Sequence, residues 1–261
     1  IIEAITIAYL KNTNVVLRQY IVTLKKASLY LKRRDTLIME FDLSVINGNN
    51  PYNIDVEKFV EQFYGFIQLN HLYDSAIRQI ETKLEIIDNE FQSTFKRDPI
   101  HTVQSRLKSP QSIAQKLIDK NIPITAESIL DHLHDIAGVR VVCHYIEDIY
   151  AVAKFLSLHD DIKLIKQKDY IKNPKSNGYR SLHLIVSVPV YLSTGKKIVP
   201  VEIQIRTIAM DFWASLEHQL HYKTTTYVSD DLAEQLRQCA ETINDTDIKM
   251  QSIYRQLNNM K

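Results

Sequence analysis

The chain has 261 residues, 45% of them hydrophobic and 24% charged, an ordinary composition for a globular protein of one large or two small domains. It contains only 5 glycines and 7 prolines, which argues against a turn-rich all-β barrel or sandwich and favours helix. The 32 basic residues nearly balance the 31 acidic ones. The protein is therefore not a polycation that coats nucleic acid, and any anion-binding site must be local.

The N-terminal segment differs in charge from the rest of the chain. Residues 1–38 hold seven basic and two acidic side chains, and the turn-like stretch Asn47–Pro51 follows. Because such a stretch is typical of a loop, we expect residues 1–50 to form an N-terminal extension of uncertain role and residues 51–261 to form the main domain. Apolar residues at helical spacing then predict one long helix or two consecutive helices over 55–95.

The middle of the chain alternates between strand and helix patterns. Between residues 102 and 206 the apolar period becomes two, interrupted by helices expected near 110–121, 126–134 and 147–158. This alternation is typical of an α/β or α+β domain. Helices are expected again over 207–222 and 230–259. The last one carries a heptad-like seam formed by Leu232, Leu236, Cys239, Ile243, Met250 and Leu257.

Cysteine usage and the lack of long apolar runs bear on location. Cys143 and Cys239 lie far apart and form no CxxC pair, so a disulfide-stapled secreted scaffold is not supported. We find no run of 18 uninterrupted apolar residues and no clear signal-peptide cleavage site. We therefore expect a cytoplasmic protein that has no membrane partner.

The predicted strands place polar side chains on one face. Successive side chains alternate across a strand, so Glu202, Gln204 and Arg206 share a face of the strand over 201–206. The same alternation groups Tyr179 with Ser181 and His183, and Gln104 with Arg106 and Lys108, while Asp135 precedes the strand over 139–143. A merely solvated sheet face is the simpler interpretation. The long cationic groups, aromatic ring, imidazole and two carboxylates favour instead a groove for an anionic ligand that contains a ring.

A nucleotide has these properties. Arginine and lysine bind phosphates, Tyr179 can stack on a base, and Asp135 with Glu202 can hold the Mg²⁺ that neutralises a triphosphate. Phosphoryl transfer is then the natural reaction, because it depends mostly on positioning and charge. The sequence contains no GxxxxGK[ST] or GxGxxG loop, no zinc-ligand spacing and no GxSxG motif, so side chains must hold the phosphates.

At these residues the sequence resembles the synthetase domain of the RelA/SpoT-homologue family, and specifically the small alarmone synthetases that make (p)ppGpp for the stringent response. The resemblance covers roughly residues 55–260 and follows the family's order. It is carried by RLKS at 106–109 with Ser112 and Lys116, HDIAGVR at 134–140, KSNGYRSLH at 175–183, VEIQIRT at 201–207 and DFWASLEH at 211–218. The implied fold is a nucleotidyltransferase-like α/β (α+β) domain with a mixed sheet of about five strands, flanked by helices, and with helical terminal segments.

The resemblance also implies roles for individual residues. Arg106 and Arg140 would sandwich the adenine of ATP, and Lys108, Ser112 and Lys116 would complete the ATP site, with the lysines on its phosphates. Asp135 and Glu202 would bind Mg²⁺, with Glu202 near the attacking hydroxyl as base or as orienting group. Tyr179 would stack on the guanine of GTP or GDP. The remaining residues around that nucleotide would be Lys175, Asn177, His183 and Gln204.

The implied reaction transfers the β,γ-pyrophosphate of ATP to the ribose 3′-OH of GTP or GDP and releases AMP. Alternatives are a catalytically silent nucleotide- or RNA-binding regulatory module and a different nucleotidyltransferase; the sequence does not identify an RNA or alarmone regulator. The seam of the last helix predicts a homo-oligomer, specifically a tetramer. His71 is the only histidine before His101, so we expect no hydrolase activity.

Three further residues receive structural interpretations. Gly138 is expected to serve close packing or a backbone turn, and Phe212 and Trp213 are expected in the core.

The basic segment at 166–169, Lys-Gln-Lys-Asp, corresponds to one that is basic in some long family members and acidic in others. Its basic character leaves the preference for GTP or GDP open.

Overall fold

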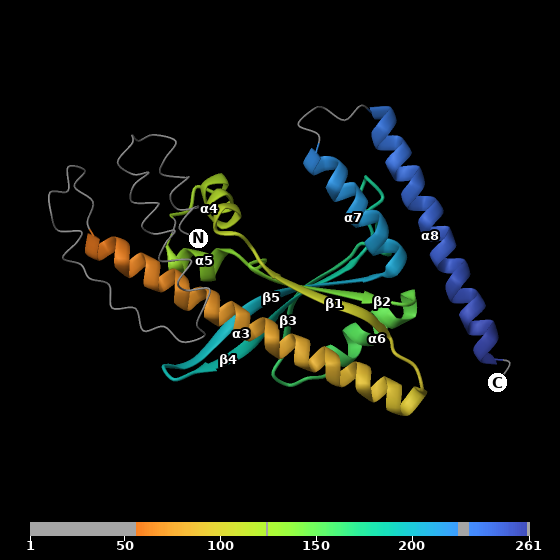
Figure 1. The fold of residues 1–261 in the computed structure, drawn as a ribbon, viewed down its shortest axis with the longest axis horizontal. Coiled ribbons are helices and arrows are strands. Elements are labelled where there is room, and N and C mark those ends of the chain that lie inside the picture. The colour runs from red at the N-terminus through yellow and green to blue at the C-terminus, as the bar shows by residue number, and fades with distance from the viewer. Residues whose placement is uncertain (1–55, 124, 224–229, 260–261) are drawn as a thin grey trace, which may run out of the picture. The chain divides into compact units, whose positions relative to one another are not determined.

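The structure is a computed structural model that describes residues 56–123, 125–223 and 230–259 (Figure 1). The expected extension over 1–50 lies outside these residues. Contacts within the chain divide the described residues into two compact units, one containing residues 56–69, 108–123 and 125–133 and the other containing residues 70–107, 134–223 and 230–259. The single domain expected over 51–261 stays a prediction.

The larger unit is built on one mixed β-sheet. Its strands are β1 (Ile100–Leu107), β2 (Ala137–Cys143), β3 (Lys163–Asp169), β4 (Leu182–Leu192) and β5 (Gly195–Thr207). The order across the sheet is β1-β2-β5-β4-β3. The pair β2 and β5 is parallel and the other pairs are antiparallel. This arrangement confirms the expected mixed sheet of five strands.

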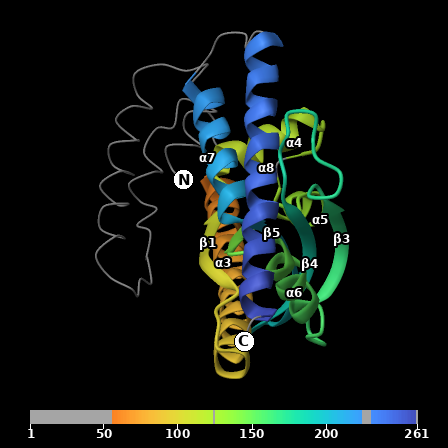
Figure 2. The same cartoon turned by 90° about the vertical axis from the view of Figure 1, so that its right-hand side faces the viewer.

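Four helices belong wholly or partly to this unit. They are the 70–95 portion of α3 (Val56–Phe95), α6 (Ile146–Leu156), α7 (Ile208–Lys223) and α8 (Asp230–Asn259). All four occur where apolar periodicity predicts them. Helices α7 and α8 lie side by side in both views (Figures 1 and 2), and the rings of Phe91 in α3 and Phe155 in α6 meet edge to face, with centroids 5.2 Å apart.

The smaller unit contains the first part of α3 together with α4 (Pro110–Asp119) and α5 (Ala126–His132). Each short helix begins at a hydroxyl cap. The Ser109 hydroxyl accepts from the Ser112 amide and the Thr125 hydroxyl from the Ser128 amide, which satisfies an amide left unpaired at a helix start. The two predicted helices are thus confirmed, each ending two residues earlier than expected.

Alternation along the strands separates a buried apolar set from a polar face. Leu184, Ile203 and Ile205 are each at most 1% exposed. Two strand assignments need correction. Strand β4 begins at Leu182, so Tyr179 and Ser181 lie in the preceding loop, and β1 ends at Leu107, so Lys108 follows the strand. At both places the alternation of polar and apolar residues extends beyond the residues that are hydrogen-bonded in the sheet.

Helix α8 packs through small and polar side chains. Its buried residues are Ala240, Asp247 and Gln251, and Ile243 packs against the small cluster that includes Trp213. The seam residues Leu232, Met250 and Leu257 are 53%, 52% and 59% exposed. These three seam residues are therefore not part of this chain's own core, whereas Ile243 of the same seam packs against it.

The structure also shows how far Phe212, Trp213 and the two cysteines are buried. Trp213 is 6% exposed and buried as predicted, whereas Phe212 is 58% exposed, so its assignment to the core is wrong. Cys143 is a buried free thiol and Cys239 an exposed one. Among the described helices, none has an apolar stretch long enough to cross a bilayer.

Candidate active site

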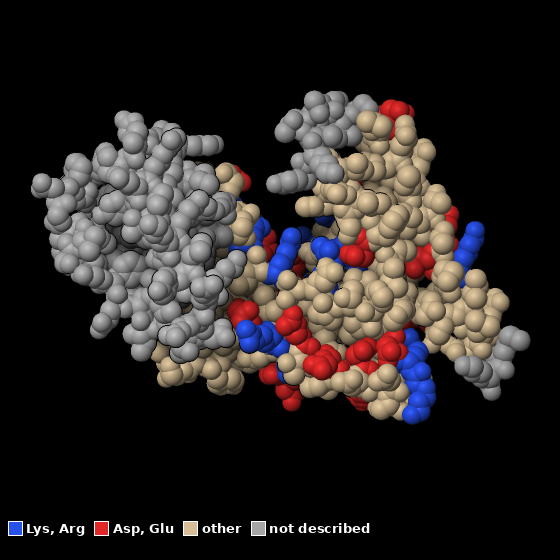
Figure 3. Space-filling model, in the orientation of Figure 1, with Lys and Arg blue, Asp and Glu red and all other residues tan. Residues whose placement is uncertain are grey.

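Cross-strand register places the polar side chains of the larger unit on one face of the sheet. Residues that pair across neighbouring strands point to the same side. One row of such pairs crosses all five strands: Lys168, His183, Gln204, Arg140 and Gln104. The adjacent row is Lys166, Ile185, Glu202, Gly138 and Arg106. The predicted chemical face is therefore present, and Figure 3 shows basic and acidic side chains next to each other beside α7.

A chain of hydrogen bonds links four residues of this face. Arg206 Nη2 donates to the Tyr179 hydroxyl at 3.1 Å, and that hydroxyl lies 2.8 Å from His183 Nε2. His183 Nδ1 lies 3.3 Å from Glu202 Oε1. Since a carboxylate only accepts, Nδ1 carries the proton and Nε2 accepts from tyrosine in the neutral ring. The four side chains are held in one orientation relative to each other.

Glu202 is an ionised carboxylate in this environment. The hydrogen bond from His183 is the main cause that lowers the pKa of Glu202, whereas burial and the charge of Asp135 act in the opposite direction. Gln204 Nε2 also donates to Glu202 Oε2 at 3.1 Å. A carboxylate with a lowered pKa is a weak general base, and its ionised oxygens are of the kind that Mg²⁺ prefers as ligands.

Arg206 is a buried cation beneath this face. It is 2% exposed, and desolvation lowers its pKa. Besides Tyr179, it donates to Gln204 Oε1 at 2.7 Å and to Asp211 Oδ1 at 3.3 Å. The same Asp211 oxygen lies 3.5 Å from Arg140 Nη1. Asp211 of α7 thus contacts both Arg140 and Arg206, and Arg206 in turn donates to Tyr179.

The loop before β4 carries three of the predicted guanine-site residues. Asn177 uses both ends of its amide within the protein, because Oδ1 accepts from the Tyr179 amide and Nδ2 donates to Glu217 Oε1, each at 3.1 Å. The ammonium of the exposed Lys175 lies 4.7 Å from the centre of the Tyr179 ring. Asn177 therefore shapes the loop, and the Lys175 ammonium lies closer to the centre of the ring than the Arg206 guanidinium carbon, which is 5.5 Å away.

Gly138 is expected to serve close packing or a backbone turn. Its backbone lacks the positive φ of Gly178 and Gly195, so no turn requires glycine here. A Cβ at this position would meet Arg106 Cγ at 3.7 Å, an ordinary van der Waals contact. Gly138 therefore lies directly beside the Arg106 side chain, at a distance that would also admit an alanine.

Lys108, Ser112 and Lys116 belong to the smaller unit. Ser112 lies in the first turn of α4, with its hydroxyl 2.8 Å from that of Ser109, and Lys116 lies in the last turn of the same helix. One helix thus carries two of these three residues, and Lys108 immediately precedes its cap. Their role in ATP binding stays a prediction.

Asp135 and Glu202 fit a magnesium site of the kind that needs substrate oxygens. They are near enough for the charge on Asp135 to raise the pKa of Glu202, and Mg²⁺ in proteins commonly takes one or two carboxylates plus phosphate oxygens. Within the described ranges, no group of three or more His, Cys, Asp or Glu side chains could hold a metal by itself. This donor set suits a metal that arrives with a nucleotide.

Known proteins share this sequence and fold. Residues 105–227 match the family model described as "Region found in RelA / SpoT proteins". GTP pyrophosphokinase YwaC of Bacillus subtilis (strain 168) is 46% identical over 186 residues, 71% of this chain and 89% of YwaC. The chain belongs to the small alarmone synthetases of the RelA/SpoT family. It is an enzyme of that class.

Solved structures of small alarmone synthetases agree with this assignment. That of small alarmone synthetase 2 from B. subtilis has a TM-score of 0.65 at 45% identity, covering 71% of this chain and 96% of its own. Small alarmone synthetase 1 from the same organism, bound to its product pppGpp, also gives 0.65, at 36% identity, covering 71% and 94%. The family expected from the sequence motifs is thus confirmed.

Some residues of this alarmone synthetase site were absent from the sequence-based site. Arg206 alternates with Glu202 and Gln204, so its strand position already put it on the same face. Asp211 and Glu217 lie on α7, and nothing in their spacing indicates that they bind Arg206 and Asn177. Only the folded arrangement identifies these two carboxylates.

Proposed function

We propose that this protein transfers the β,γ-pyrophosphate of ATP to the ribose 3′-OH of GTP or GDP, producing (p)ppGpp and AMP. The observation that carries the proposal is the pair of side-chain rows on the polar face of the sheet. Glu202 of β5 lies in the middle of these rows. Arg106 and Arg140 lie on its β1 and β2 side, and His183, which contacts Tyr179, lies on its β4 side. The names of its relatives, GTP pyrophosphokinases, support the same reaction.

We assign ATP to the arginine side of the face. Arg106 and Arg140 offer planar guanidinium groups that can stack on adenine. Lys108, Ser112 and Lys116 are proposed to complete this site. The guanine nucleotide is assigned to Tyr179, with Lys175, Asn177, His183 and Gln204 around it. Because Lys175 is exposed, its ammonium can leave the Tyr179 ring to a base and pair with a phosphate.

Asp135 and Glu202 are proposed to hold Mg²⁺ together with phosphate oxygens of ATP. When bound, the metal supplies charge neutralisation on the transferred group. Glu202 accepts a hydrogen bond from the attacking 3′-hydroxyl. This bond directs a lone pair of the 3′-oxygen toward the β-phosphorus. The bond from the 3′-oxygen to this phosphorus forms as the bond between the α,β-bridging oxygen and the β-phosphorus breaks. AMP leaves with that oxygen, and the proton of the 3′-hydroxyl is released to water.

Product stoichiometry tests this reaction. With ATP, GTP or GDP and Mg²⁺, we expect AMP to accumulate one-for-one with a guanosine product that carries two additional phosphates, as separated by anion-exchange chromatography. Accumulation of ADP would contradict the proposal. Retention of AMP on an acceptor would favour a different nucleotidyltransferase, and no turnover would favour the silent regulatory module.

Tyr179→Ala should raise the KM for the guanine nucleotide by about 5- to 150-fold, since loss of a base-stacking ring costs about 1–3 kcal/mol. The KM for ATP should change little. Tyr179→Phe keeps the ring and is the matched control, with a smaller effect. Steady-state kinetics with each nucleotide varied in turn provide the measurement, and equal changes in both KM values would rule out this assignment.

Asp135→Asn should weaken activity and raise the Mg²⁺ concentration needed for half-maximal rate, because one of two metal-binding carboxylates is neutralised. Titration of the rate with Mg²⁺ at saturating nucleotides measures this. An unchanged Mg²⁺ requirement with normal activity would remove Asp135 from the site.

We propose a homo-oligomer, specifically a homotetramer, held partly by the terminal helices. Large apolar side chains on α7 and α8 are between 44% and 59% exposed in the single chain, among them Ile208, Phe212, Leu216, Leu220, Leu232, Met250 and Leu257. Apolar surface of this extent is typical of an interface. Light scattering at micromolar concentration should give the mass of four chains, and the mass of one chain would contradict the proposal.

We also propose that the protein is located in the cytoplasm. Both of its cysteines, Cys143 and Cys239, are free thiols, as is usual for proteins of a reducing compartment.

A further inference from the structure

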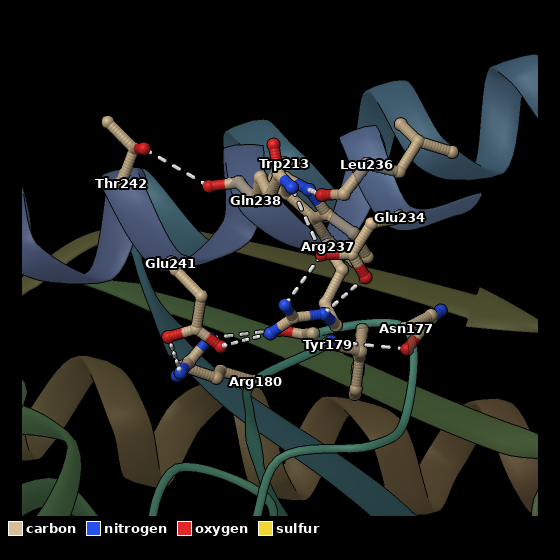
Figure 4. Close-up of polar contacts among 11 residues, drawn as sticks. Asn177, Tyr179, Arg180, Trp213, Glu234, Leu236, Arg237, Gln238, Glu241 and Thr242 are labelled. Carbon is tan, nitrogen blue, oxygen red and sulfur yellow. Dashed lines mark hydrogen bonds and ion pairs between the residues drawn. The ribbon is translucent and has the colours of Figure 1, made fainter. Parts of the chain in front are cut away.

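The loop that carries Tyr179 lies against helix α8, about 60 residues later in the chain (Figure 4). Gly178 has a φ of +89°, and a Cβ built on it would come within 2.5 Å of the Ala240 Cβ. The Arg237 carbonyl oxygen lies 3.5 Å from the same position. Only glycine permits both this backbone conformation and this close approach. The backbone of the loop therefore lies directly against Ala240 of the helix, next to Tyr179.

A buried arginine ties the other side of Tyr179 to the same helix. Arg180 is 9% exposed. Its Nη1 donates to the Gly178 carbonyl oxygen at 3.1 Å, and its Nη2 donates to Glu241 Oε2 at 2.9 Å. One guanidinium thus closes the loop on itself and fastens it to α8. The residues before and after Tyr179 are both held.

Helix α8 is anchored independently of this loop. Trp213 Nε1 of α7 donates to the Leu236 carbonyl at 3.0 Å, and the Thr207 hydroxyl donates to Asp247 at 2.6 Å. Near its C-terminal end, the rings of Tyr254 and Tyr145 stack with centroids 4.2 Å apart. Because these contacts fix α8 to the sheet unit, loss of the loop contact alone should not release the helix.

We propose that Arg180, Ala240 and Glu241 are positioning residues for the guanine nucleotide: they hold the Tyr179 loop on α8 so that the ring is preorganised for stacking. This inference rests on the proposed function, since it requires Tyr179 to bind the guanine base. The polar network described above fixes the hydroxyl end of Tyr179 through Arg206 and His183, whereas the contacts with α8 fix its backbone. A ring held at both ends loses little freedom when it binds.

Glu241→Ala tests the proposal, with Glu234→Ala as the matched control. Both glutamates lie on α8 with side chains 46% exposed, but Glu234 binds Arg237 and Gln238 of its own helix and not the loop. We expect Glu241→Ala to raise the KM for GTP and for GDP by about tenfold, as the loss of a charged hydrogen bond predicts, and to leave the KM for ATP unchanged. Glu234→Ala should match the parent protein in all three values.

Hydrogen exchange provides a readout that does not depend on catalysis. The amides of Gly178 and Tyr179 donate within the loop, to the Lys175 carbonyl at 2.8 Å and to Asn177 Oδ1 at 3.1 Å. They should exchange faster in Glu241→Ala than in the parent, while amides at the centre of β5 do not change. The milder Glu241→Gln should show the same direction with a smaller effect, and it replaces Glu241→Ala if that variant melts well below the parent.

Different results would overturn the proposed function and the positioning role. If the parent makes no pyrophosphorylated guanosine, the proposed function is wrong. If the parent is active but the glutamate variants keep the parent's loop exchange and KM values, the positioning role is wrong. Equal increases in the KM for ATP and for the guanine nucleotides would also overturn it, because a merely structural role affects both.

Discussion

Glu202→Gln should lower turnover by about 1,000-fold while the protein remains folded and binds nucleotide. The hydrogen bond from His183 lowers the pKa of this carboxylate, which keeps it ionised. An amide could not replace that charge beside the proposed Mg²⁺ and the transferring phosphoryl group. Loss of transition-state charge stabilisation of this kind costs about 3–4 kcal/mol. Rapid-quench or steady-state assays measure the loss, and calorimetry with a non-hydrolysable ATP analogue measures the retained affinity.

The expected contrast between rate and binding follows from the residues left in place. Arg106 and Arg140 lie in neighbouring strand positions of the same face and keep their charges in the variant. A carboxylate that only closed a surface ion pair would contribute about 0–1 kcal/mol to stability and nothing to rate. A folded Glu202→Gln protein with turnover within about tenfold of the parent would therefore exclude Glu202 from this role.

Arg206→Met should lower the free energy of unfolding by about 3 kcal/mol, because removal of one partner of a buried ion pair leaves the others unsatisfied. The side chain is 2% exposed and donates to Tyr179, Gln204 and Asp211. Asp211 retains Arg140 as a partner, which places the loss at the low end of the range for buried pairs. Urea denaturation followed by the fluorescence of Trp213 measures it.

Arg237→Met is the control for this variant. Arg237 is an arginine with two carboxylate partners on an exposed helix face, where solvent screening leaves ion pairs with little effect on stability. Equal destabilisation by the two substitutions would show that Arg206 has no special structural role. We also expect Arg206→Met to raise the KM for the guanine nucleotide, since Tyr179 loses the donor that holds its hydroxyl.

Periodicity predicts the secondary structure and the polar face because both depend on local alternation. Helices α3, α6, α7 and α8 occur where apolar spacing indicates them, and the alternation in β5 correctly groups Glu202 with Gln204. The alternation fails at Tyr179, which continues the pattern of β4 without joining its ladder, because Gly178 turns the backbone and Asn177 binds the Tyr179 amide. Local pattern alone does not show where a ladder begins.

Long-range contacts are the part that the sequence does not reveal. Phe212 and Trp213 are adjacent aromatic residues on one helix, yet one is exposed and the other buried, since only the position of α8 decides which side is covered. The pairing of Arg180 with Glu241 likewise depends on how α8 lies against the loop. Helix α8 carries several carboxylates that could pair with Arg180 as far as charge and spacing show. Only the folded arrangement identifies Glu241 as the partner.

Transfer of a label from ATP separates pyrophosphate transfer from the other possible reactions in one experiment. With ATP labelled at the γ-phosphorus, GDP and Mg²⁺, we expect the label in the guanosine product, on the terminal phosphate of a pyrophosphate attached at the 3′ position. Unlabelled AMP should form in equal amount. Digestion that removes only 3′-attached phosphates should then release the label. Label found on the 5′ side of the guanosine, or released as free phosphate or pyrophosphate with no guanosine product, would contradict pyrophosphate transfer.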